Sequence, residues 1–382
     1  MRPSYDLKRC RARIPVLADS IALANCSHAP RTEPARRAVE SYLADWGRAV
    51  MDWDVWMEQV DQAKAEFAAL IHASVEEVAM MPSVTAAAAV VASTFDHVRP
   101  RNRVLVSEAE FPTVGHVWLA RERHGAEVRW VPLRDGVVPQ EGYAELLDDR
   151  TELVCACHAF YQNGFKQDVG AIAQAAHEQG ALIFVDAYQT AGLHPVDVRE
   201  LDVDFLTSGV HKFLMGIPGI AFLYVKRELI DRLEPSFTGW FGREDIFAFD
   251  PKRLDWAATA NRLEMATPPV VNAYVARAGI ALIREIGCEA IREWTDALSQ
   301  RLIDGGLARG LEIYGTTDVA RKTATTAFVC PGNAEVIETR LLGRRIHAAA
   351  RGRVIRLAPH YFNSIEDIET GLDALADLLA SQ

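Results

Sequence analysis

The segment Ser208-Gly209-Val210-His211-Lys212-Phe213 places one lysine in an otherwise apolar, glycine-containing part of the chain. Two apolar strand-like runs, Phe205–Thr207 and Ala221–Val225, lie on either side of it. A lysine on a surface loop is normally solvated, but the apolar residues Phe213–Met215 predict that Lys212 points inward. Burial disfavours the ammonium form and lowers the pKa of a lysine, which makes the amine a nucleophile near neutral pH.

Upstream of this segment, Phe184-Val185-Asp186-Ala187-Tyr188-Gln189 places an acidic residue just past a buried apolar run. Ligands of parallel sheets bind outside the carboxyl ends of the strands. A carboxylate there can pair with the ring nitrogen of pyridoxal 5′-phosphate (PLP) and keep the ring protonated and electron-withdrawing. Alone, such an aspartate is more typical of a helix N-cap or a turn.

A third motif, Pro82-Ser83-Val84-Thr85, opens an alanine-rich helical segment. Free N–H groups and two hydroxyls at a helix N-terminus form a phosphate-binding arrangement. By itself the motif indicates only an N-cap. The chain order of phosphate seat, carboxylate and lysine makes the three motifs informative together, and it predicts that Lys212 carries PLP.

These motifs resemble the class V aminotransferase family of fold type I PLP enzymes, which includes cysteine desulfurases, kynureninases, isopenicillin N epimerases and aminotransferases. The resemblance extends from about Leu23 to the C-terminal helix, and its most specific motifs are Asp-x-x-Gln at 186–189 and His-Lys at 211–212. It implies that Asp186 pairs with the ring nitrogen, Gln189 with the phenolic oxygen, and that Lys212 forms the Schiff base. The further cofactor contacts that it implies are Ser83, Val84, Thr85, Phe111, His158, Ser208, His211, Trp240 and Thr267.

Two of these matches favour particular branches of the family. Glu110-Phe111-Pro112-Thr113 resembles the kynureninase-like stretch whose phenylalanine stacks on the pyridine ring, where cysteine desulfurases more often have a histidine. The segments around Trp240 and Thr267 resemble those that reach the phosphate of the neighbouring subunit in kynureninase-like members. The resemblance therefore implies a homodimer with shared active sites.

On the substrate side, Arg356-Leu357-Ala358-Pro359-His360 resembles the family segment whose arginine binds the α-carboxylate of an amino acid. A planar guanidinium that is always charged suits a bidentate contact with a carboxylate. The resemblance also places Asn25 and His28 at the substrate entrance. The expected partner is thus a small amino acid, bound by Arg356, Asn25 and His28.

A missing cysteine limits the reactions that the chain is expected to catalyse. Cysteine desulfurases carry a cysteine on a loop upstream of the carboxylate-binding arginine, and Arg345–Arg353 contains none. Cys330 ends an apolar run and is better explained as a buried structural residue. A persulfide-forming desulfurase is disfavoured, which leaves direct C–S elimination open. The leading prediction is a lyase that labilises Cα–H and cleaves the side chain at a C–S or C–C bond, as in kynureninase.

Other functions compete with this prediction. A true aminotransferase or an epimerase is the alternative within the family. A catalytically silent PLP-fold protein is disfavoured because Lys212, Asp186 and Arg356 are all present. A simple nucleotide-binding domain lacks both the Gly-x-Gly-x-x-Gly and the Walker patterns.

The order of elements predicts an α/β fold of the type I PLP-transferase class. From about Asp61 to Arg227, helical segments alternate with short apolar runs, as in a large domain around a mainly parallel, seven-stranded sheet. After a loop-rich stretch, a long helical segment at 271–304 and shorter strand-like pieces predict a small α+β C-terminal domain. The predicted divisions are an N-terminal segment at 1–30 that belongs with the small domain, a PLP-binding domain at 31–270, and the small domain at 271–382.

Composition sets the remaining limits. The chain has 382 residues, a formal charge of −11 and 49% hydrophobic residues. An acidic chain is a poor candidate for nucleic-acid binding. Six scattered cysteines predict free thiols in a reducing compartment and no metal site. No membrane-length apolar segment and no signal-like region after Met1–Arg13 is apparent, so we expect a cytoplasmic protein without membrane partners.

Overall fold

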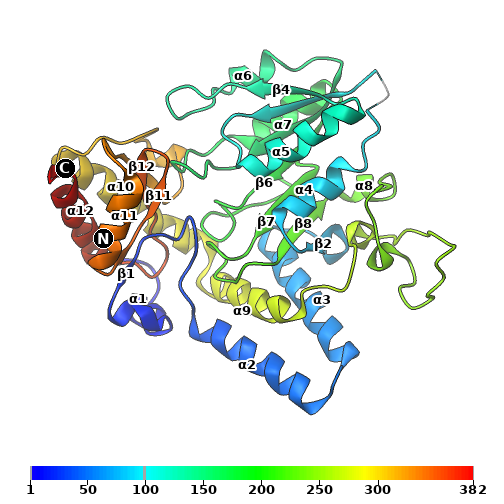
Figure 1. Ribbon diagram of the computed structural model, residues 1–382, viewed down its shortest axis with the longest axis horizontal. Helices are drawn as coiled ribbons and strands as arrows, with labels where there is room; N and C mark the ends of the chain where they lie inside the picture. Colours follow the sequence, from blue (N-terminus) through cyan, green and yellow to red (C-terminus); the bar gives the residue numbers. More distant parts are fainter. Residues whose placement is uncertain (1, 98–99, 382) are drawn as a thin grey trace.

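A seven-stranded sheet forms the centre of the large domain in the computed structural model, which describes residues 2–97 and 100–381 (Figure 1). The outer limits of the predicted domains, Met1 and Gln382, lie outside the described residues. The strands, in their order across the sheet, are β2 (Val78–Met81), β8 (Ala221–Val225), β7 (Phe205–Gly209), β6 (Leu182–Asp186), β5 (Thr151–Cys157), β3 (Arg103–Ser107) and β4 (Glu127–Val131). Only β8 runs antiparallel to its neighbours in this sheet.

Helices cover both faces of this sheet, which explains why its strands are almost continuously apolar. Alternate residues of one strand enter different cores: Leu206 packs into one, and Phe205 into the other. The first face is covered mainly by α3 (Trp53–Leu70) and α7 (Val169–Glu178), and the second by α4 (Val84–Ala92) and α5 (Pro112–Arg121). The remaining helices of this part of the chain are α2 (Glu33–Arg48), α6 (Glu141–Ala144), α8 (Arg227–Ile230) and α9 (Val270–Ile286).

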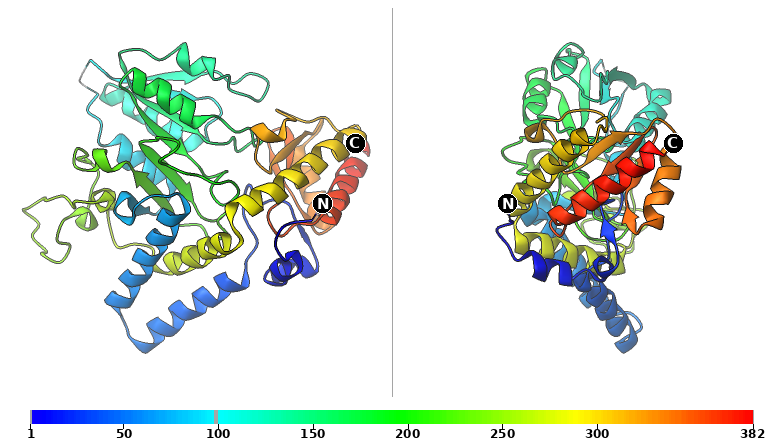
Figure 2. Two further views of the ribbon diagram at one scale, coloured as in Figure 1. Left: turned by 180° about the vertical axis from the view of Figure 1, so that it is seen from behind. Right: turned by 90° about the vertical axis from the view of Figure 1, so that its left-hand side faces the viewer.

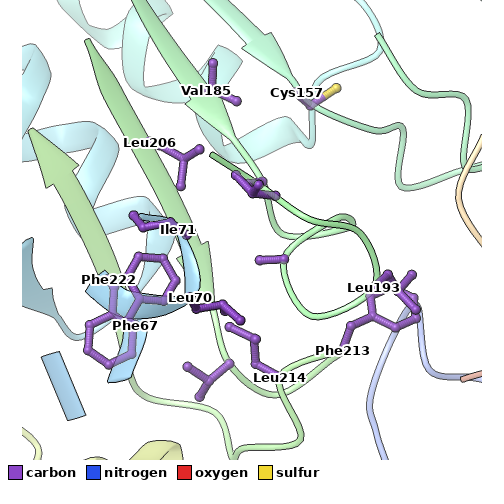
Figure 3. Close-up of a cluster of buried hydrophobic side chains, with 14 of the residues drawn as sticks. Phe67, Leu70, Ile71, Cys157, Val185, Leu193, Leu206, Phe213, Leu214 and Phe222 are labelled. Atoms are coloured by element: carbon purple, nitrogen blue, oxygen red, sulfur yellow. The ribbon is translucent and has the colours of Figure 1, made fainter. Parts of the chain in front are cut away.

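The core on the first face contains a stacked aromatic pair, drawn in Figure 3. The rings of Phe67 on α3 and Phe222 on β8 lie 4.7 Å apart between centroids, with an interplanar angle of 14°. Both side chains are fully buried, and Leu206 and Ile71 lie nearby in the same cluster. This contact fixes α3 against the sheet close to the strand that precedes Lys212.

The small domain lies at one end of the molecule, together with both described ends of the chain (Figures 1 and 2). Its antiparallel sheet has the order β11 (Ala349–Arg351), β12 (Val354–Leu357), β9 (Thr326–Val329). Its helices are α10 (Cys288–Ala308), α11 (Ala334–Gly343) and α12 (Ile365–Ala380). Near the N-terminus, α1 (Leu7–Ala12) precedes β1 (Ile21–Ala22), which pairs in parallel with β10 (Ile346–His347).

The predicted fold class is confirmed: the chain has a large α/β domain with a mainly parallel sheet and a small α+β C-terminal domain. The predicted helical segment at 271–304 is helical and consists of two helices, because Gly287, with a φ of 92°, separates α9 from α10. The α9 helix packs against α2 and α3. The exact domain bounds stay a prediction.

Across the described part of the chain, no helix combines the length and apolar character that crossing a bilayer requires. All six cysteines are unpaired.

Candidate active site

A cavity of about 360 Å³ lies at the carboxyl ends of the central strands, where α4 begins and where the small domain approaches. Its walls include residues from three separated parts of the chain: the N-terminal segment, the large domain and the small domain. The predicted site residues that line it are Ser83, Val84, Thr85, Phe111, Asp186, Gln189, His211, Lys212 and Arg356.

Lys212 lies in the loop after β7, with its amine directed into this cavity. Its Nζ lies 4.0 Å from the centroid of the Tyr188 ring and 5.8 Å from that of Phe111. Burial lowers the pKa of Lys212 to about 8, while the nearby Asp186 carboxylate acts in the opposite direction. About a tenth of the amine is therefore neutral and nucleophilic at pH 7, far more than for a solvated lysine.

Asp186 is the last residue of β6 and is buried. The backbone N–H of Tyr188 donates to its Oδ1 at 2.8 Å. Burial raises the pKa of Asp186, and the N–H of Tyr188 and the charge of Lys212 oppose this shift. A cation such as a protonated ring nitrogen would favour the carboxylate form at this position.

A second buried carboxyl group, Glu110, was not identified as a site residue from the sequence. Neither of its oxygens has a hydrogen-bond partner among the described residues. Burial, followed by the proximity of Asp186, raises the pKa of Glu110 well above its usual range. We therefore interpret Glu110 as a neutral acid, which leaves Asp186 as the anionic group at this end of the cavity.

The start of α4 has the features of a phosphate seat. Ser83 is the N-cap, and its Oγ accepts from the N–H of Ala86 at 3.1 Å. Val84 and Thr85 occupy the first turn, where backbone N–H groups have no partner within the helix. The Thr85 hydroxyl lies 3.2 Å from that of Thr113 at the start of α5. These donors at a positive helix end suit a phosphate group.

Tyr188 is held under Lys212 by a contact that the sequence did not reveal. Its hydroxyl lies 2.7 Å from Nδ1 of His211. Burial, and then the charge of Lys212, lowers the pKa of His211 to about 4, so its ring is neutral. A Cβ atom on Gly209 would lie only 2.0 Å from the Tyr188 hydroxyl, so a glycine is required there for this packing.

Arg356, on β12, is only 1% exposed. Its Nη2 donates to Ser27 Oγ at 2.8 Å and its Nη1 to the Tyr161 carbonyl at 2.6 Å. No acidic side chain of the described chain forms an ion pair with it. A buried guanidinium without an anion is costly unless a ligand supplies one, which makes Arg356 a candidate site for a carboxylate.

The N-terminal segment contributes differently from the prediction. Asn25 is fully buried outside the cavity wall, where its Nδ2 donates to the carbonyls of Ala358 at 2.8 Å and Ala22 at 3.2 Å. His28 is exposed, with its ring 5.5 Å from that of His211. The residues between them, Cys26 and Ser27, line the cavity instead. The amide of Gln189 donates to the Cys26 carbonyl at 3.1 Å, which leaves one N–H of its NH₂ group free.

Four other predicted contacts lie outside this cavity. His158 follows Cys157 and lines a different hollow, with its Nδ1 3.1 Å from Thr190 Oγ1. Ser208 is buried and donates to the carbonyl of Gly209 at 2.9 Å. Trp240 packs beside Trp53, with ring centroids 6.1 Å apart, and Thr267 is exposed. The prediction for the last two concerned the cavity of a neighbouring subunit.

The residues of the cavity fit PLP as a group. A buried carboxylate for the ring nitrogen, an amine of lowered pKa and an open helix N-terminus face one space. The substrate-side arginine lies on the same cavity without an anionic partner.

Comparison with known proteins agrees with this chemistry. The family model described as aminotransferase class-V matches residues 34–353. An uncharacterised aminotransferase of Bacillus subtilis is 36% identical over 373 residues and covers 96% of each chain. A probable cysteine desulfurase of Halobacterium salinarum is 28% identical and covers 81% of this chain and 78% of its own.

Solved structures share the fold. The apo cysteine desulfurase of Thermococcus onnurineus superposes with a TM-score of 0.89 at 23% identity, over 100% of this chain and 99% of its own. The cystine C–S lyase C-DES, solved with its reaction product cysteine persulfide, gives 0.88 at 20% identity, over 95% and 99%. A mutant of that lyase carries glycine covalently linked to its PLP cofactor. The chain thus belongs to the class V aminotransferase family of PLP-dependent enzymes, and its cofactor is PLP.

Proposed function

We propose that this enzyme removes the Cα proton of an α-amino acid and cleaves its side chain, with C–S bond cleavage as the preferred reaction. The observation that carries the proposal is that Lys212 and the unpaired Arg356 face one cavity. The arginine supplies the charge for an α-carboxylate, and the lysine supplies a base within reach of the attached carbon.

Arg356 binds the α-carboxylate in a fixed orientation. Its guanidinium is positioned by Ser27 Oγ and by the Tyr161 carbonyl, so a bound carboxylate meets a preorganised pair of donors. Burial around Arg356 excludes water and strengthens the contact. The substrate's amine and Cα are thereby held next to Lys212.

Lys212 is the residue that would hold the cofactor, and its amine would act as the base once the substrate amine is bound. Its amine, with a pKa of about 8, then accepts the Cα proton. PLP, when bound, supplies the electron sink that makes this proton acidic. Asp186 would keep the ring nitrogen protonated, Gln189 would donate to the phenolic oxygen, and Ser83, Val84 and Thr85, which line the same cavity, would hold the phosphate.

Side-chain cleavage at a C–S bond is supported by the absence of the desulfurase cysteine. Cys330 follows β9 and is 2% exposed, and the cysteines on the cavity wall are Cys26 and Cys157. A direct elimination needs no such loop thiol. The fold shared with the cystine C–S lyase is compatible with this reaction. Kynureninase-like C–C cleavage, suggested by Phe111, is the alternative within the lyase class.

Transamination is the second candidate function. It is favoured by the name of the Bacillus subtilis relative, which is described as an aminotransferase. In that reaction Lys212 would return the proton to the cofactor carbon instead of allowing a side-chain group to leave. The products separate the two functions, because a lyase needs no keto-acid acceptor.

The proposal is tested by absorbance and product analysis. We expect the purified enzyme to absorb at roughly 410–430 nm, as a lysine-bound PLP does, and to be fixed by borohydride. Lys212→Ala should lose borohydride fixation, whereas Lys8→Ala, at an exposed lysine, should keep it. An amino-acid panel is then assayed for pyruvate, alanine, anthranilate and sulfide. Pyruvate with sulfide would support C–S cleavage, and keto acid formed only with an acceptor would contradict it.

We further propose a homodimer in which Trp240 and Thr267 reach the phosphate of the neighbouring subunit. Exposed phenylalanines close to Trp240, at 237, 247 and 249, support a partner on this surface. Mixing Lys212→Ala with Trp240→Ala subunits should restore part of the activity, because one site of each mixed dimer is intact. A monomer in solution would contradict this.

We also propose that the enzyme is cytoplasmic. All six cysteines are unpaired, which is typical of a reducing compartment.

A further inference from the structure

Two arginines project from the same hairpin of the small domain into the cavity. Arg351 is the last residue of β11, and Arg356 lies on β12 beside it (Figure 1). Ala349 is the residue directly opposite Arg356 in this antiparallel pair. Because side chains two residues apart on a strand share a face, Arg351 lies on the same face as Arg356. Both line the cavity that contains Lys212.

The two guanidinium groups differ in how many donors they have left. Arg356 already donates from Nε to the Ala349 carbonyl, from Nη1 to the Tyr161 carbonyl and from Nη2 to Ser27. An arginine has five N–H donors, so two remain, the number that one bidentate carboxylate requires. The α-carboxylate of the substrate therefore accepts hydrogen bonds from the two remaining N–H donors of Arg356.

Arg351 has no such contacts. It is exposed, unlike Arg356, and its side chain has no hydrogen bond or ion pair with any described residue. Its neighbours in the sequence face elsewhere and have partners: Arg344 pairs with Asp377 at 2.6 Å, and Arg353 lies over the Tyr314 ring at 5.6 Å. Arg351 is thus the arginine of this segment that reaches the cavity with all its donors free.

The cavity wall carries more positive than negative side chains. Among its described lining residues, Lys212, Arg351 and Arg356 are cationic and Asp186 is the anionic one. Asp186 lies at the end of β6, where the ring nitrogen of the cofactor would use it. The start of α4, with Thr85 and Thr113, is a separate seat for the phosphate. No described lining residue of the cavity pairs with Arg351, whose exposed guanidinium is hydrated until a ligand binds.

We propose that Arg351 binds a second acidic group, so that the substrate is an α-amino acid with a short side chain ending in a carboxylate or a sulfinate. The inference rests on the proposed function, in which Arg356 binds the α-carboxylate. The Cα atoms of diagonal residues in such a pair lie about 7–8 Å apart, which suits two acidic groups separated by only a few bonds. Cysteine sulfinate has this chemistry together with a C–S bond, and aspartate is its carboxylate analogue.

The experiment measures binding without turnover. α-Methyl amino acids have no Cα proton, so the reaction stops once they are bound. Wild-type holoenzyme is titrated with α-methylaspartate and with its neutral isostere, α-methylasparagine, and the change in cofactor absorbance gives each Kd. The same titrations are made with Arg351→Gln, Arg356→Gln and the control Arg353→Gln. Cysteine sulfinate and aspartate are then compared as competitors, which separates the two kinds of acidic group.

We expect the wild type and Arg353→Gln to bind the acid at least about tenfold more tightly than the amide, as a charged hydrogen-bonded contact requires. Arg351→Gln should lose this preference while its Kd for the amide changes less than about twofold. Arg356→Gln should weaken both ligands equally. Equal binding of acid and amide by the wild type, which needs no variant, would overturn the inference. A preference that survives in Arg351→Gln would also overturn it.

Two further outcomes have separate meanings. If Arg351→Gln instead releases PLP, Arg351 belongs to the cofactor phosphate and the inference is wrong. If neither α-methyl ligand changes the absorbance of the wild type, the proposed function itself fails. A tight neutral ligand without acid preference would leave the proposed function intact and reject only the role of Arg351.

Discussion

The amine of Lys212 lies 4.0 Å from the centroid of the Tyr188 ring, and this ring is fixed from its other end by the hydrogen bond to His211. The tyrosine therefore forms a floor that limits where the lysine amine can move. Gly209 leaves the space that the Tyr188 hydroxyl occupies. Gly209 and His211, which are close to Lys212 in the sequence, thus set the position of the lysine through Tyr188, which follows the neighbouring strand β6.

The first prediction concerns this floor. Gly209→Ala should displace Tyr188, because the added Cβ would overlap its hydroxyl. Overpacking of this kind costs about 1–3 kcal/mol, and we expect a lower free energy of unfolding together with slower attachment of PLP. Gly343→Ala is the control, since a Cβ there meets no atom within 4 Å. Normal cofactor attachment in Gly209→Ala would show that the position of Tyr188 does not matter.

The second prediction concerns pH. With a pKa of about 8, Lys212 is mostly protonated at lower pH and neutral at higher pH. The rate of PLP attachment to the apoenzyme should therefore rise with pH and level off above about pH 8–9. Asp186→Asn removes an anion that favours the ammonium form, so the midpoint should move to lower pH. Arg351→Gln removes a cation that disfavours it, so the midpoint should move to higher pH.

The measurement is the rate of absorbance change after PLP is mixed with the apoenzyme at each pH. Arg353→Gln serves as the control and should leave the midpoint unchanged. A midpoint near 10 in the wild type would mean that Lys212 is solvated in the apoenzyme, which contradicts its burial here.

The third prediction concerns Ser27. Ser27→Ala removes one acceptor from the Arg356 guanidinium. Because the guanidinium is charged, this hydrogen bond can contribute about 1.5–3 kcal/mol, so the Kd for α-methyl amino acids should rise by up to about 10- to 150-fold while the cofactor spectrum stays unchanged. Ser41→Ala, on the exposed face of α2, should have no effect. An equal loss in both variants would indicate a general loss of stability instead.

The fourth prediction concerns the stacked pair in Figure 3. Phe67→Ala removes a fully buried ring that contacts Phe222. Such a change costs about 3–5 kcal/mol, measurable as a lower midpoint in urea denaturation. Leu307→Ala, at a half-exposed position on α10, should change stability by less than about 0.5 kcal/mol. A small effect of Phe67→Ala would mean that the surrounding core repacks.

The sheet, and the place of Lys212 and Asp186 on one cavity, were predictable because their signals are local. The apolar run Ala221–Val225 matches β8 residue for residue, since burial on both faces leaves no polar position to blur its limits. Lys212 and Asp186 were identified because charged residues among apolar neighbours are unusual in any sequence.

The substrate side could not be predicted in the same way, because it forms only when distant segments meet. Ser27 has no property of its own that indicates a partner, and its role depends on Arg356 reaching it across 329 positions of sequence. Asn25 was predicted to contact substrate, but its amide is used to join the N-terminal segment to Ala358. His158 was predicted as a cofactor contact from the family resemblance, but it lines a different hollow and does not reach the cavity of Lys212.

The pairing of β1 with β10 has a consequence for how the enzyme is made. Asn25 is bonded to a residue 333 positions later, and Arg11 to Asp367 over a similar span. During synthesis the N-terminal segment leaves the ribosome first, yet its strand partner emerges near the end. The large domain can fold earlier from its own contacts, but the Ser27–Arg356 wall cannot close until translation is almost complete. Nascent chains should therefore acquire the cofactor pocket before they acquire the substrate pocket.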